Sequence, residues 1–564
     1  MKPICGLILC VLAALVGCTG PALRSQSPEQ TDEEAGPKTR LVGDVARASG
    51  NSYVKAEGVA LVTGLDGTGE DPAPSPQRAA LLHDMQTRSV QNPSQLLASP
   101  NTALVLVRGF IPPGAQKGDK FDLEVQVPSR SETSSLRGGW MMETRLTELA
   151  VLGNEIHEGH PLAIGEGSVL VDPSANGDKD RALLVRGKIL GGGRVLLPRS
   201  LDLVIIPDEK SFRLSSQIGD AINKRFHTFD RGLQKKMANP QTDERITLAI
   251  HPRYQDNISR YLRVVRSIAV KETPAQRSVR LHLLERQLLD PITAASTALK
   301  LEAIGHDAIP TLTAGIKASD VEVRFYSAES LAYLDQSQAA APLAAAAREE
   351  PSLRAYALAA LSAMDDVAAY DQLCSLLEVP SAETRYGAFR ALWAMNANDP
   401  VVRGEFLGEQ FSYHVLNTAG PAMVHVTRSY RPEVVLFGQD QRLKTPVMLE
   451  AGKSILVHAD AGERITVSKF VVDQPDQKRV VSTSLDDVIR AIVELGGTYP
   501  DVVQALQQAK TSQALSGRFE VDAVPDSRRE LPTETTEEEH GNSKFEVANP
   551  LPDLFFTKRG KSNH

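Results

Sequence analysis

Aromatic side chains are scarce in this 564-residue chain, at 5% of the sequence, so its hydrophobic cores must consist mainly of aliphatic residues. An excess of positive charge is also lacking, because 62 lysines and arginines stand against 70 aspartates and glutamates, for a net charge of −8. Nucleic-acid-binding proteins usually carry a basic surface. We therefore expect no nucleic-acid partner. The length of the chain allows several domains.

Cysteine is rare and unevenly placed. Cys5, Cys10 and Cys18 lie in the first eighteen residues, and the fourth cysteine is Cys374. If the first segment is cleaved and Cys18 is modified, Cys374 alone stays free and no intramolecular disulfide can form. Cys374 lies in an apolar stretch that is predicted to be helical, where we expect it to be buried.

The N-terminus has the pattern of an export signal. Lys2 precedes an almost continuous apolar run over residues 4–16, which is short for a membrane span but typical of a signal peptide. The run ends in Leu15-Val16-Gly17-Cys18, which resembles a lipobox with cleavage before Cys18 and lipid attached to its thiol. The alternative is an ordinary signal peptide that contains a cysteine. A lipidated chain would stay at a membrane surface, and Thr19, where an aspartate would indicate inner-membrane retention, favours the outer membrane.

Residues 41 to 270 alternate between strand and helix patterns. Short apolar or alternating runs bounded by Gly and Pro predict strands, and longer runs with helical spacing predict helices. The predicted strands are 59–63, 104–107, 122–127, 168–171, 182–186 and 201–206, and the predicted helices are 215–226 and 256–267. This mixture is typical of an α+β domain.

A glycine-rich segment follows the first predicted strand. A nucleotide-binding loop would require Lys-Ser/Thr or a G-x-G-x-x-G spacing, but Glu70 and Asp71 follow the last glycine. Carboxylates there would repel phosphate. The glycines are instead predicted to form a structural turn motif, since glycine readily adopts positive φ; they are Gly58, Gly64, Gly67 and Gly69.

The run GVALVTGLDGTG at residues 58–69 resembles the opening motif of the bacterial flagellar P-ring protein family. Further stretches resemble that family in the same order: ALVLV before IPP within 103–113, GDKFD at 118–122, SLRGG at 135–139 and IGDAINKRF at 218–226. The resemblance returns at 485–521, where two amphipathic helices and a last strand are expected. It implies a structural subunit that self-associates into a periplasmic ring around the flagellar rod, without catalysis.

This chain departs from the family pattern in three ways. The family normally carries a plain cleaved signal peptide, whereas this chain has the predicted lipobox. Its glycine motif has Ala60 where glycine is usual and Glu70 where aspartate is usual. The third and largest departure is an insertion at about 273–400.

The insertion contains a helical repeat. Arg324, Arg354 and Arg385 recur at spacings of 30 and 31 residues within similar apolar patterns. This resembles short HEAT-type repeats, which stack helix pairs into a solenoid and typically bind proteins. The alternative is an alanine-rich helical bundle with accidental spacing. The three arginines either form structural hydrogen bonds between repeats or line a face that binds acidic partners.

The sequence carries no recognisable catalytic or metal-binding motif. His157 and His160 have the wrong spacing for a helical zinc-peptidase pair, and residues 451–454 lack the first glycine of a Walker loop. We therefore predict no cofactor, no metal site and no enzymatic activity. The other strong local pattern, at 454–472, predicts a β-hairpin.

The predicted fold class is multidomain α+β: a mixed α/β P-ring-like body, interrupted by an all-α HEAT-like solenoid, then a small β-rich segment and a C-terminal helical hairpin. The predicted segments are a lipoprotein signal peptide at 1–17, a flexible tether at 18–40, the body at 41–272, the helical repeats at 273–400, the β-rich segment at 401–482, the helical hairpin and strand at 483–522, and a disordered acidic tail at 523–564, in which Leu551, Leu554, Phe555 and Phe556 form a candidate docking segment.

The leading functional hypothesis is a subunit of the flagellar P-ring, lipid-anchored in the periplasm. Its expected partners are further copies of itself, the rod and outer-ring proteins, and the membrane, with peptidoglycan as a further candidate. The main alternative is an envelope lipoprotein that uses the same body and repeats as an adaptor for other proteins. A third hypothesis, an envelope enzyme acting on peptidoglycan, would require a deep pocket with clustered carboxylates.

Overall fold

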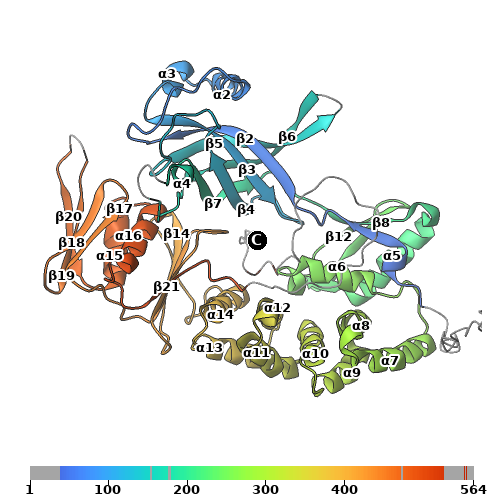
Figure 1. Ribbon diagram of the computed structural model, residues 1–564. Helices are drawn as coiled ribbons and strands as arrows, with labels where there is room; N and C mark the ends of the chain where they lie inside the picture. Colours follow the sequence, from blue (N-terminus) through green and yellow to red (C-terminus); the bar gives the residue numbers. More distant parts are fainter. Residues whose placement is uncertain are drawn as a thin grey trace, which may run out of the picture.

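The computed structural model describes residues 39–152, 155–175, 180–471 and 474–525, together with Pro552 and Leu554. Figure 1 shows these parts following a closed circuit: a barrel, a second sheet with its helices, a row of helices, and a C-terminal region that returns to the barrel. The predicted lipobox at Cys18 and most of the predicted tether and tail lie outside the described residues. Within the described ranges, no helix is both long and apolar enough to cross a bilayer.

Six antiparallel strands close into a barrel (Figure 1). In β2, β3 and β4, alternate side chains point into the barrel and are buried there, as the period of two residues requires. The strands, in barrel order, are β2 (Val54–Thr63), β3 (Thr102–Ile111), β4 (Lys120–Gln126), β7 (Arg186–Val195), β6 (Glu155–Ser168) and β5 (Trp140–Leu152). The helices α2 (Pro76–Thr87), α3 (Pro93–Leu97) and α4 (Arg181–Leu184) lie outside the barrel.

The strands predicted at 59–63, 104–107 and 122–127 are confirmed as parts of β2, β3 and β4. The strand predicted at 182–186 was wrong, because residues 181–184 form the short helix α4. The strand predicted at 168–171 was also mostly wrong, since β6 ends at Ser168 and Leu170 makes only an isolated bridge with Lys188. Both segments are short apolar runs, and such runs do not distinguish a strand from a buried turn.

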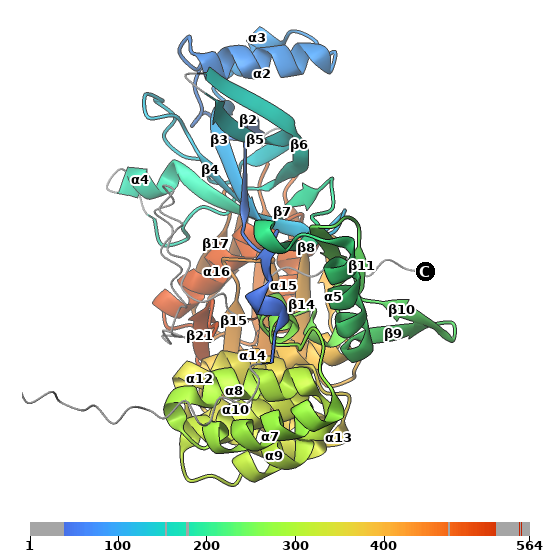
Figure 2. The same ribbon diagram turned by 90° about the vertical axis from the view of Figure 1, so that its right-hand side faces the viewer.

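A second, four-stranded sheet lies beside the barrel and is covered by two helices (Figure 2). Its strands, in order, are β1 (Ala46–Ser49), β8 (Leu201–Ile205), β12 (Arg245–Leu248) and β11 (Ala238–Pro240). The helices are α5 (Phe212–Arg225), capped by Ser211, and α6 (Ile258–Arg266), capped by Asn257. Both helices and the strand predicted at 201–206 are thereby confirmed. A separate hairpin, β9 (His227–Asp230) and β10 (Leu233–Lys236), projects from this region.

Eight helices follow in two layers. Each odd-numbered helix packs against the next even-numbered one, and the even-numbered helices α8, α10, α12 and α14 form a continuous inner row. Their bounds are α7 (Pro274–Leu288), α8 (Pro291–Ile304), α9 (Ile309–Gly315), α10 (Val321–Tyr333), α11 (Ala340–Glu349), α12 (Pro351–Ser362), α13 (Val367–Leu376) and α14 (Ala382–Met395). We refer to residues 274–395 as the helical segment.

The C-terminal region consists of two sheets and a helical hairpin. The first sheet is mixed, with the order β13 (Glu405–Leu407), β14 (Phe411–Leu416), β16 (Glu433–Phe437), β15 (Met423–Val426) and β21 (Arg518–Val521). The second sheet is antiparallel, with the order β17 (Val447–Ala451), β18 (Ile455–Ala459), β19 (Arg464–Lys469) and β20 (Gln477–Ser482). The helices α15 (Leu485–Glu494) and α16 (Tyr499–Thr511) pack on the second sheet. The predicted hairpin of β18 and β19 and the predicted pair of helices are confirmed.

One hydrophobic core runs without interruption through three of these parts. It begins in the second sheet around Ile218 and Tyr261, continues through the helical segment, and reaches Val435 and Phe437 in the first C-terminal sheet. Leu554 of the predicted tail also belongs to this core and is 3% exposed. The helical segment is therefore packed into the rest of the chain at both of its ends.

Candidate functional site

The glycine motif at the end of β2 combines a turn with two close backbone contacts. Gly64 and Gly67 have φ values of +78° and +81°, which glycine adopts without steric cost. The turn is closed by a hydrogen bond of 3.1 Å from the Thr68 amide to the Leu65 carbonyl oxygen. The Gly67 amide also donates to the Asn101 side chain at 2.8 Å.

Gly58 and Gly69 are not turn residues, which corrects that part of the prediction. Gly58 lies inside β2, where an added Cβ would stand 2.6 Å from the Arg145 carbonyl oxygen of β5. At Gly69 an added Cβ would stand 2.0 Å from the Thr102 carbonyl oxygen. Real Cβ atoms do not approach backbone oxygen so closely. These two glycines therefore allow neighbouring backbones to come together.

The glycine motif packs directly against the SLRGG segment at 135–139. The Thr68 hydroxyl donates to the Ser135 carbonyl oxygen at 2.8 Å, and the Ser134 amide donates to the Thr68 carbonyl oxygen at 3.0 Å. An added Cβ on Gly139 would lie 2.8 Å from Cδ2 of Leu65, which is fully buried. Two of the stretches that carry the sequence resemblance thus form one packed unit.

Polar contacts join this barrel to the C-terminal region. Lys453 Nζ donates to the Leu65 carbonyl oxygen at 3.2 Å and lies 3.6 Å from the Asp66 carboxylate. Arg428 forms an ion pair of 2.8 Å with Asp172. Burial raises the pKa of Asp122, whose carboxylate accepts hydrogen bonds from the amides of Gly191 and Tyr430. The glycine motif therefore lies at the junction of two regions that are almost 400 residues apart in sequence.

A buried charge cluster, which we call the first cluster, holds one end of the helical segment. Arg260 of α6 contacts the carboxylates of Glu302 in α8 and Glu329 in α10. The Tyr254 hydroxyl donates to Glu302 at 2.6 Å, and the Arg260 guanidinium lies 4.8 Å from the centre of the Tyr333 ring. Burial by itself lowers the pKa of Arg260, but the two glutamates outweigh it, so the pKa is raised and the guanidinium stays charged.

A second cluster holds the other end. Glu433 of β16 accepts a hydrogen bond of 2.7 Å from the Tyr386 hydroxyl and forms an ion pair of 3.0 Å with Arg390, both in α14. Burial by itself raises the pKa of Glu433, but nearby positive charges, chiefly Arg390 and Arg431, lower it to about 2. His425 stacks on Tyr386 with 3.7 Å between ring centres, and its complete burial lowers its pKa to about 3. The imidazole is therefore neutral at ordinary pH.

Neither cluster was predicted from the sequence. The one available signal was a set of charged residues, such as Glu302 and Arg390, within otherwise apolar helical patterns. That pattern does not reveal a partner, because Arg260 and Glu302 are 42 residues apart. Only the packing of α6 on α8 brings them together.

The three repeat arginines all donate to backbone carbonyl groups before their own helix. Arg324 contacts the carbonyl oxygen of Ala318 at 2.9 Å, Arg354 that of Ala347 at 3.0 Å, and Arg385 that of Leu377 at 2.8 Å. Arg354 and Arg385 are 6% and 0% exposed. At Arg354 and Arg385 these contacts and the burial favour the structural interpretation over a binding face, whereas Arg324 is partly exposed.

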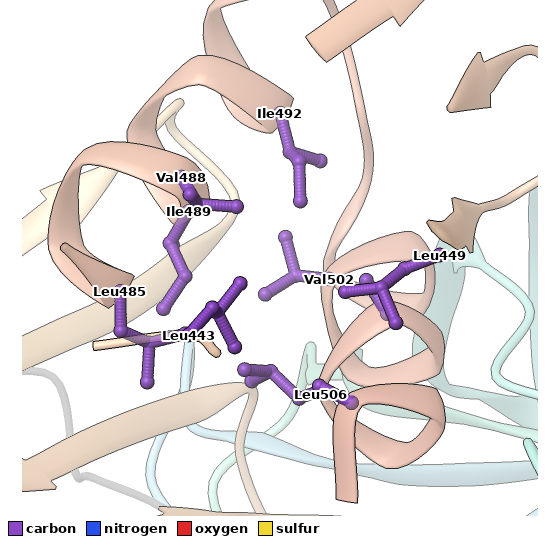
Figure 3. Close-up of a pocket in the computed structure, with 10 residues that line it drawn as sticks. Leu443, Leu449, Leu485, Val488, Ile489, Ile492, Val502 and Leu506 are labelled. Carbon is purple, nitrogen blue, oxygen red and sulfur yellow. The ribbon is translucent and has the colours of Figure 1, made fainter. Parts of the chain in front are cut away.

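Among the described residues, no three histidine, cysteine, aspartate or glutamate side chains are arranged to hold a metal ion. Cys374 is half-buried rather than fully buried, and burial raises the pKa of its thiol. Figure 3 shows a pocket between α15, α16 and β17. Its lining is entirely aliphatic, as expected for a packing seam of the core rather than a binding site, and consists of Leu443, Leu449, Leu485, Val488, Ile489, Ile492, Val502, Ala505, Leu506 and Ala509.

Comparison with known proteins finds a relationship for the N-terminal half of the described structure. The family model "Flagellar P-ring protein" matches residues 41–281. Over these residues the chain is similar to the flagellar P-ring family. The matched P-ring region contains the barrel, the second sheet, α5, α6 and the beginning of α7, and it therefore extends past the predicted body boundary at residue 272.

Individual relatives agree with this assignment. A flagellar P-ring protein of Desulfotalea psychrophila is 29% identical over 246 residues, which cover 42% of this chain and 60% of the relative. One from Thermotoga maritima is 27% identical over 248 residues, covering 42% of this chain and 69% of the relative. One from Sodalis glossinidius is 30% identical over 182 residues, or 47% of its length. The chain thus spans between about half and two thirds of these P-ring proteins, and the resemblance expected at 485–521 lies outside the family match.

Proposed function

We propose that this protein is a structural subunit of the periplasmic P-ring of the flagellar basal body, where it supports the rod and flagellum-dependent motility. The family match over residues 41–281 carries this proposal. The packing of the glycine motif on the SLRGG segment adds support, because the residues that resemble the family are those that hold the barrel together. The work of such a subunit is packing against its neighbours, and it requires no catalysis.

The proposal extends to the parts that the family match does not reach. The helical segment is a HEAT-like solenoid whose inner row of helices joins the P-ring region to the C-terminal region. A lipid on Cys18 anchors the subunit in the outer membrane. The residues that flank this cysteine favour that membrane. The proposed partners are further copies of the chain, the rod, the outer-ring proteins and the membrane, with peptidoglycan as a further candidate.

A second function has one observation in its favour. The helical segment lies almost wholly outside the matched residues, and solenoids of helix pairs typically bind proteins. An envelope lipoprotein could use the P-ring region as a scaffold and the helical segment as an adaptor for another assembly.

Purification of intact hook–basal bodies tests the proposal. The chain is tagged at its C-terminus, cells are extracted in mild detergent, and the ring fraction is analysed for its proteins. We expect near-stoichiometric recovery of the chain with the rings. Basal bodies that contain a complete periplasmic ring without this chain would overturn the proposal and favour the adaptor function.

A further inference from the structure

The hairpin of β9 and β10 is an exposed finger that packs on no other sheet. Its two strands form a sheet of their own, and every residue from Phe229 to Lys236 is exposed. Arg231 and Gly232 both have positive φ, at +47° and +82°, as in the two-residue turn that suits a tight hairpin. Figure 2 shows β9 and β10 projecting well beyond the neighbouring α5. A two-stranded hairpin alone in water is marginally stable, so an exposed one is better explained by a partner that covers it.

Large apolar side chains lie on both faces of this finger. Phe229 is 69% exposed and pairs with Gln234, whereas Leu233 is 76% exposed and pairs with Asp230. Residues that pair directly share a face, and adjacent residues of a strand alternate between faces. Phe229 and Leu233 therefore point to opposite sides. Each face of the finger therefore presents one large apolar side chain to a partner.

The charges of the finger select its partner. Arg231, Lys235 and Lys236 outnumber Asp230, whereas the whole chain has a net charge of −8. The helical segment contributes 15 acidic and 10 basic residues. Exposed acidic residues of this segment, among them Asp365 and Asp371, give the chain itself a surface of opposite charge to the finger. Insertion of the tip into a lipid bilayer is disfavoured, because Asp230 and Arg231 would lose their hydration there.

The exposed start of α13 has the complementary composition. Val367 is 74% exposed, and the acidic residues Asp365, Asp366 and Asp371 lie around it in sequence. Figure 1 places α13 at the opposite end of the helical segment from α5 and β12, next to which the finger arises. A contact between two different surfaces of one molecule is heterologous, which is the head-to-tail arrangement that can close into a ring.

We infer that the β9–β10 finger of one copy docks against the acidic surface around Val367 of the next copy. This inference rests on the proposed function, since it assigns the contact by which the ring closes. Leu233 supplies the apolar anchor against Val367, and Lys235, on the same face of the hairpin, faces Asp365 and Asp371. Phe229 and Lys236 lie on the opposite face. The partner that covers the finger is thus a second copy of this chain.

Pairwise crosslinking tests the contact directly. Two variants of the full chain, Leu233→Cys and Val367→Cys, are made in a Cys374→Ser background, mixed in detergent and oxidised. We expect a covalent dimer only when both variants are present. Ile292→Cys serves as the matched control in place of Val367→Cys, because Ile292 is 89% exposed at the other end of the helical segment. Equal crosslinking with Ile292→Cys would overturn the inference.

Charge exchange gives a second, independent readout. Lys235→Glu combined with Lys236→Glu should weaken self-association at least tenfold in sedimentation, and adding Asp365→Lys and Asp371→Lys should restore it. Melting temperature checks that each variant folds. Unchanged self-association of the lysine variant would overturn the inference. If the same variant lost binding to anionic lipid vesicles while its self-association stayed intact, the finger would bind lipid instead, and the inference would also be overturned.

The outcomes also separate this inference from the proposed function. A finger variant that still enters complete rings in purified basal bodies refutes the finger contact and leaves the P-ring function standing. If the chain self-associates through the finger but is absent from basal bodies, the finger contact stands and the P-ring function is refuted.

Discussion

Arg390 and Glu433 form an ion pair of 3.0 Å whose side chains are 4% and 1% exposed, at the point where α14 meets the first C-terminal sheet. Arg260 and Glu302, 9% and 0% exposed, occupy the equivalent position where α6 meets α8. The helical segment is therefore fixed at both ends by charges withdrawn from water. A buried pair holds its geometry strictly, because a charge without its partner is costly in a low-dielectric interior.

Breaking the second cluster should destabilise the contact between α14 and the first C-terminal sheet. We expect Arg390→Met to lower the free energy of unfolding by about 3–5 kcal/mol, because Glu433 would be left as a buried charge with weaker compensation. Urea denaturation followed by circular dichroism measures this. Arg108→Met is the control: Arg108 pairs with Glu124 at the surface, 53% and 42% exposed, and such pairs contribute less than about 1 kcal/mol. Equal effects of the two substitutions would contradict the prediction.

Acid should unfold the protein through His425 and Glu433. Unfolded His425 binds a proton near its usual pKa of 6.5, whereas burial keeps the folded imidazole neutral down to about 3. Stability therefore falls as the pH drops through this window, by at most about 1.4 kcal/mol per pH unit. Glu433 has a folded pKa of about 2 against its usual 4.5, so its contribution is present above 4.5 and is lost as the pH falls toward 2.

Urea midpoints measured at several pH values between about 7 and 4 check this slope. His425→Phe should make it shallower, because one buried imidazole that protonates on unfolding is lost, whereas His251, whose pKa burial lowers to about 4, keeps its own contribution. His282→Gln is the matched control, since the His282 side chain is 80% exposed. A slope that His425→Phe leaves unchanged would assign the acid sensitivity to other groups.

The glycine motif should tolerate substitution unevenly. Gly69→Ala places a Cβ 2.0 Å from a backbone oxygen, and we expect a loss of about 3 kcal/mol from this overpacking. Gly67→Ala meets no atom within 4 Å but keeps a φ of +81°, which costs alanine about 1–2 kcal/mol. Gly67→Asn should cost less, because asparagine tolerates this conformation. Thermal unfolding ranks the three variants, and a loss at Gly67→Ala greater than at Gly69→Ala would contradict the packing argument.

The repeat arginines should act on stability. Arg385→Ala removes hydrogen bonds from a buried guanidinium to the Leu377 carbonyl oxygen and the Thr418 hydroxyl, and we expect a loss of about 3 kcal/mol, since hydrogen bonds to charged groups contribute about 1.5–3 kcal/mol each. Arg348→Ala, at an exposed position of α11, should change stability little. A variant Arg385→Ala of unchanged stability that fails to bind an acidic partner would support the binding-face interpretation instead.

Lipidation should depend on Cys18 alone. We expect Cys18→Ser to abolish incorporation of radiolabelled fatty acid and to release the chain from the membrane fraction, because a lipobox directs the lipid to the cysteine that directly follows the cleavage site. Cys10→Ser is the control, since the predicted cleavage removes that residue. Absence of label from the unaltered chain would identify the N-terminus as an ordinary signal peptide, and label that persists in Cys18→Ser would place the lipid on another residue.

Local patterns predicted three of the six barrel strands, β2, β3 and β4, together with β8, α5, α6 and the C-terminal helices, because side-chain periodicity depends only on neighbours along the chain. The strands β5, β6 and β7 were not predicted. The prediction for 182–186 was wrong, because this apolar run of strand length lies largely in the short helix α4. Local patterns also predicted Gly58 as a turn residue, although its role in β2 is to admit the backbone of Arg145. The sequence around either strand does not reveal that the two backbones approach each other closely.

The sequence by itself determined the resemblance of residues 41–281 to the P-ring family, the repeating arginines, the helices α5, α6, α15 and α16 and the strands β2, β3, β4 and β8, since these depend on residue type and short-range spacing. Tertiary structure alone decided that six strands close into a barrel, that Lys453 meets the glycine motif, that Glu302 and Glu433 become buried partners of arginines, and that Phe229 and Leu233 stay uncovered. The physical reason is that burial and pairing are properties of distant segments brought together, and a side chain's exposure is settled only by what finally packs over it.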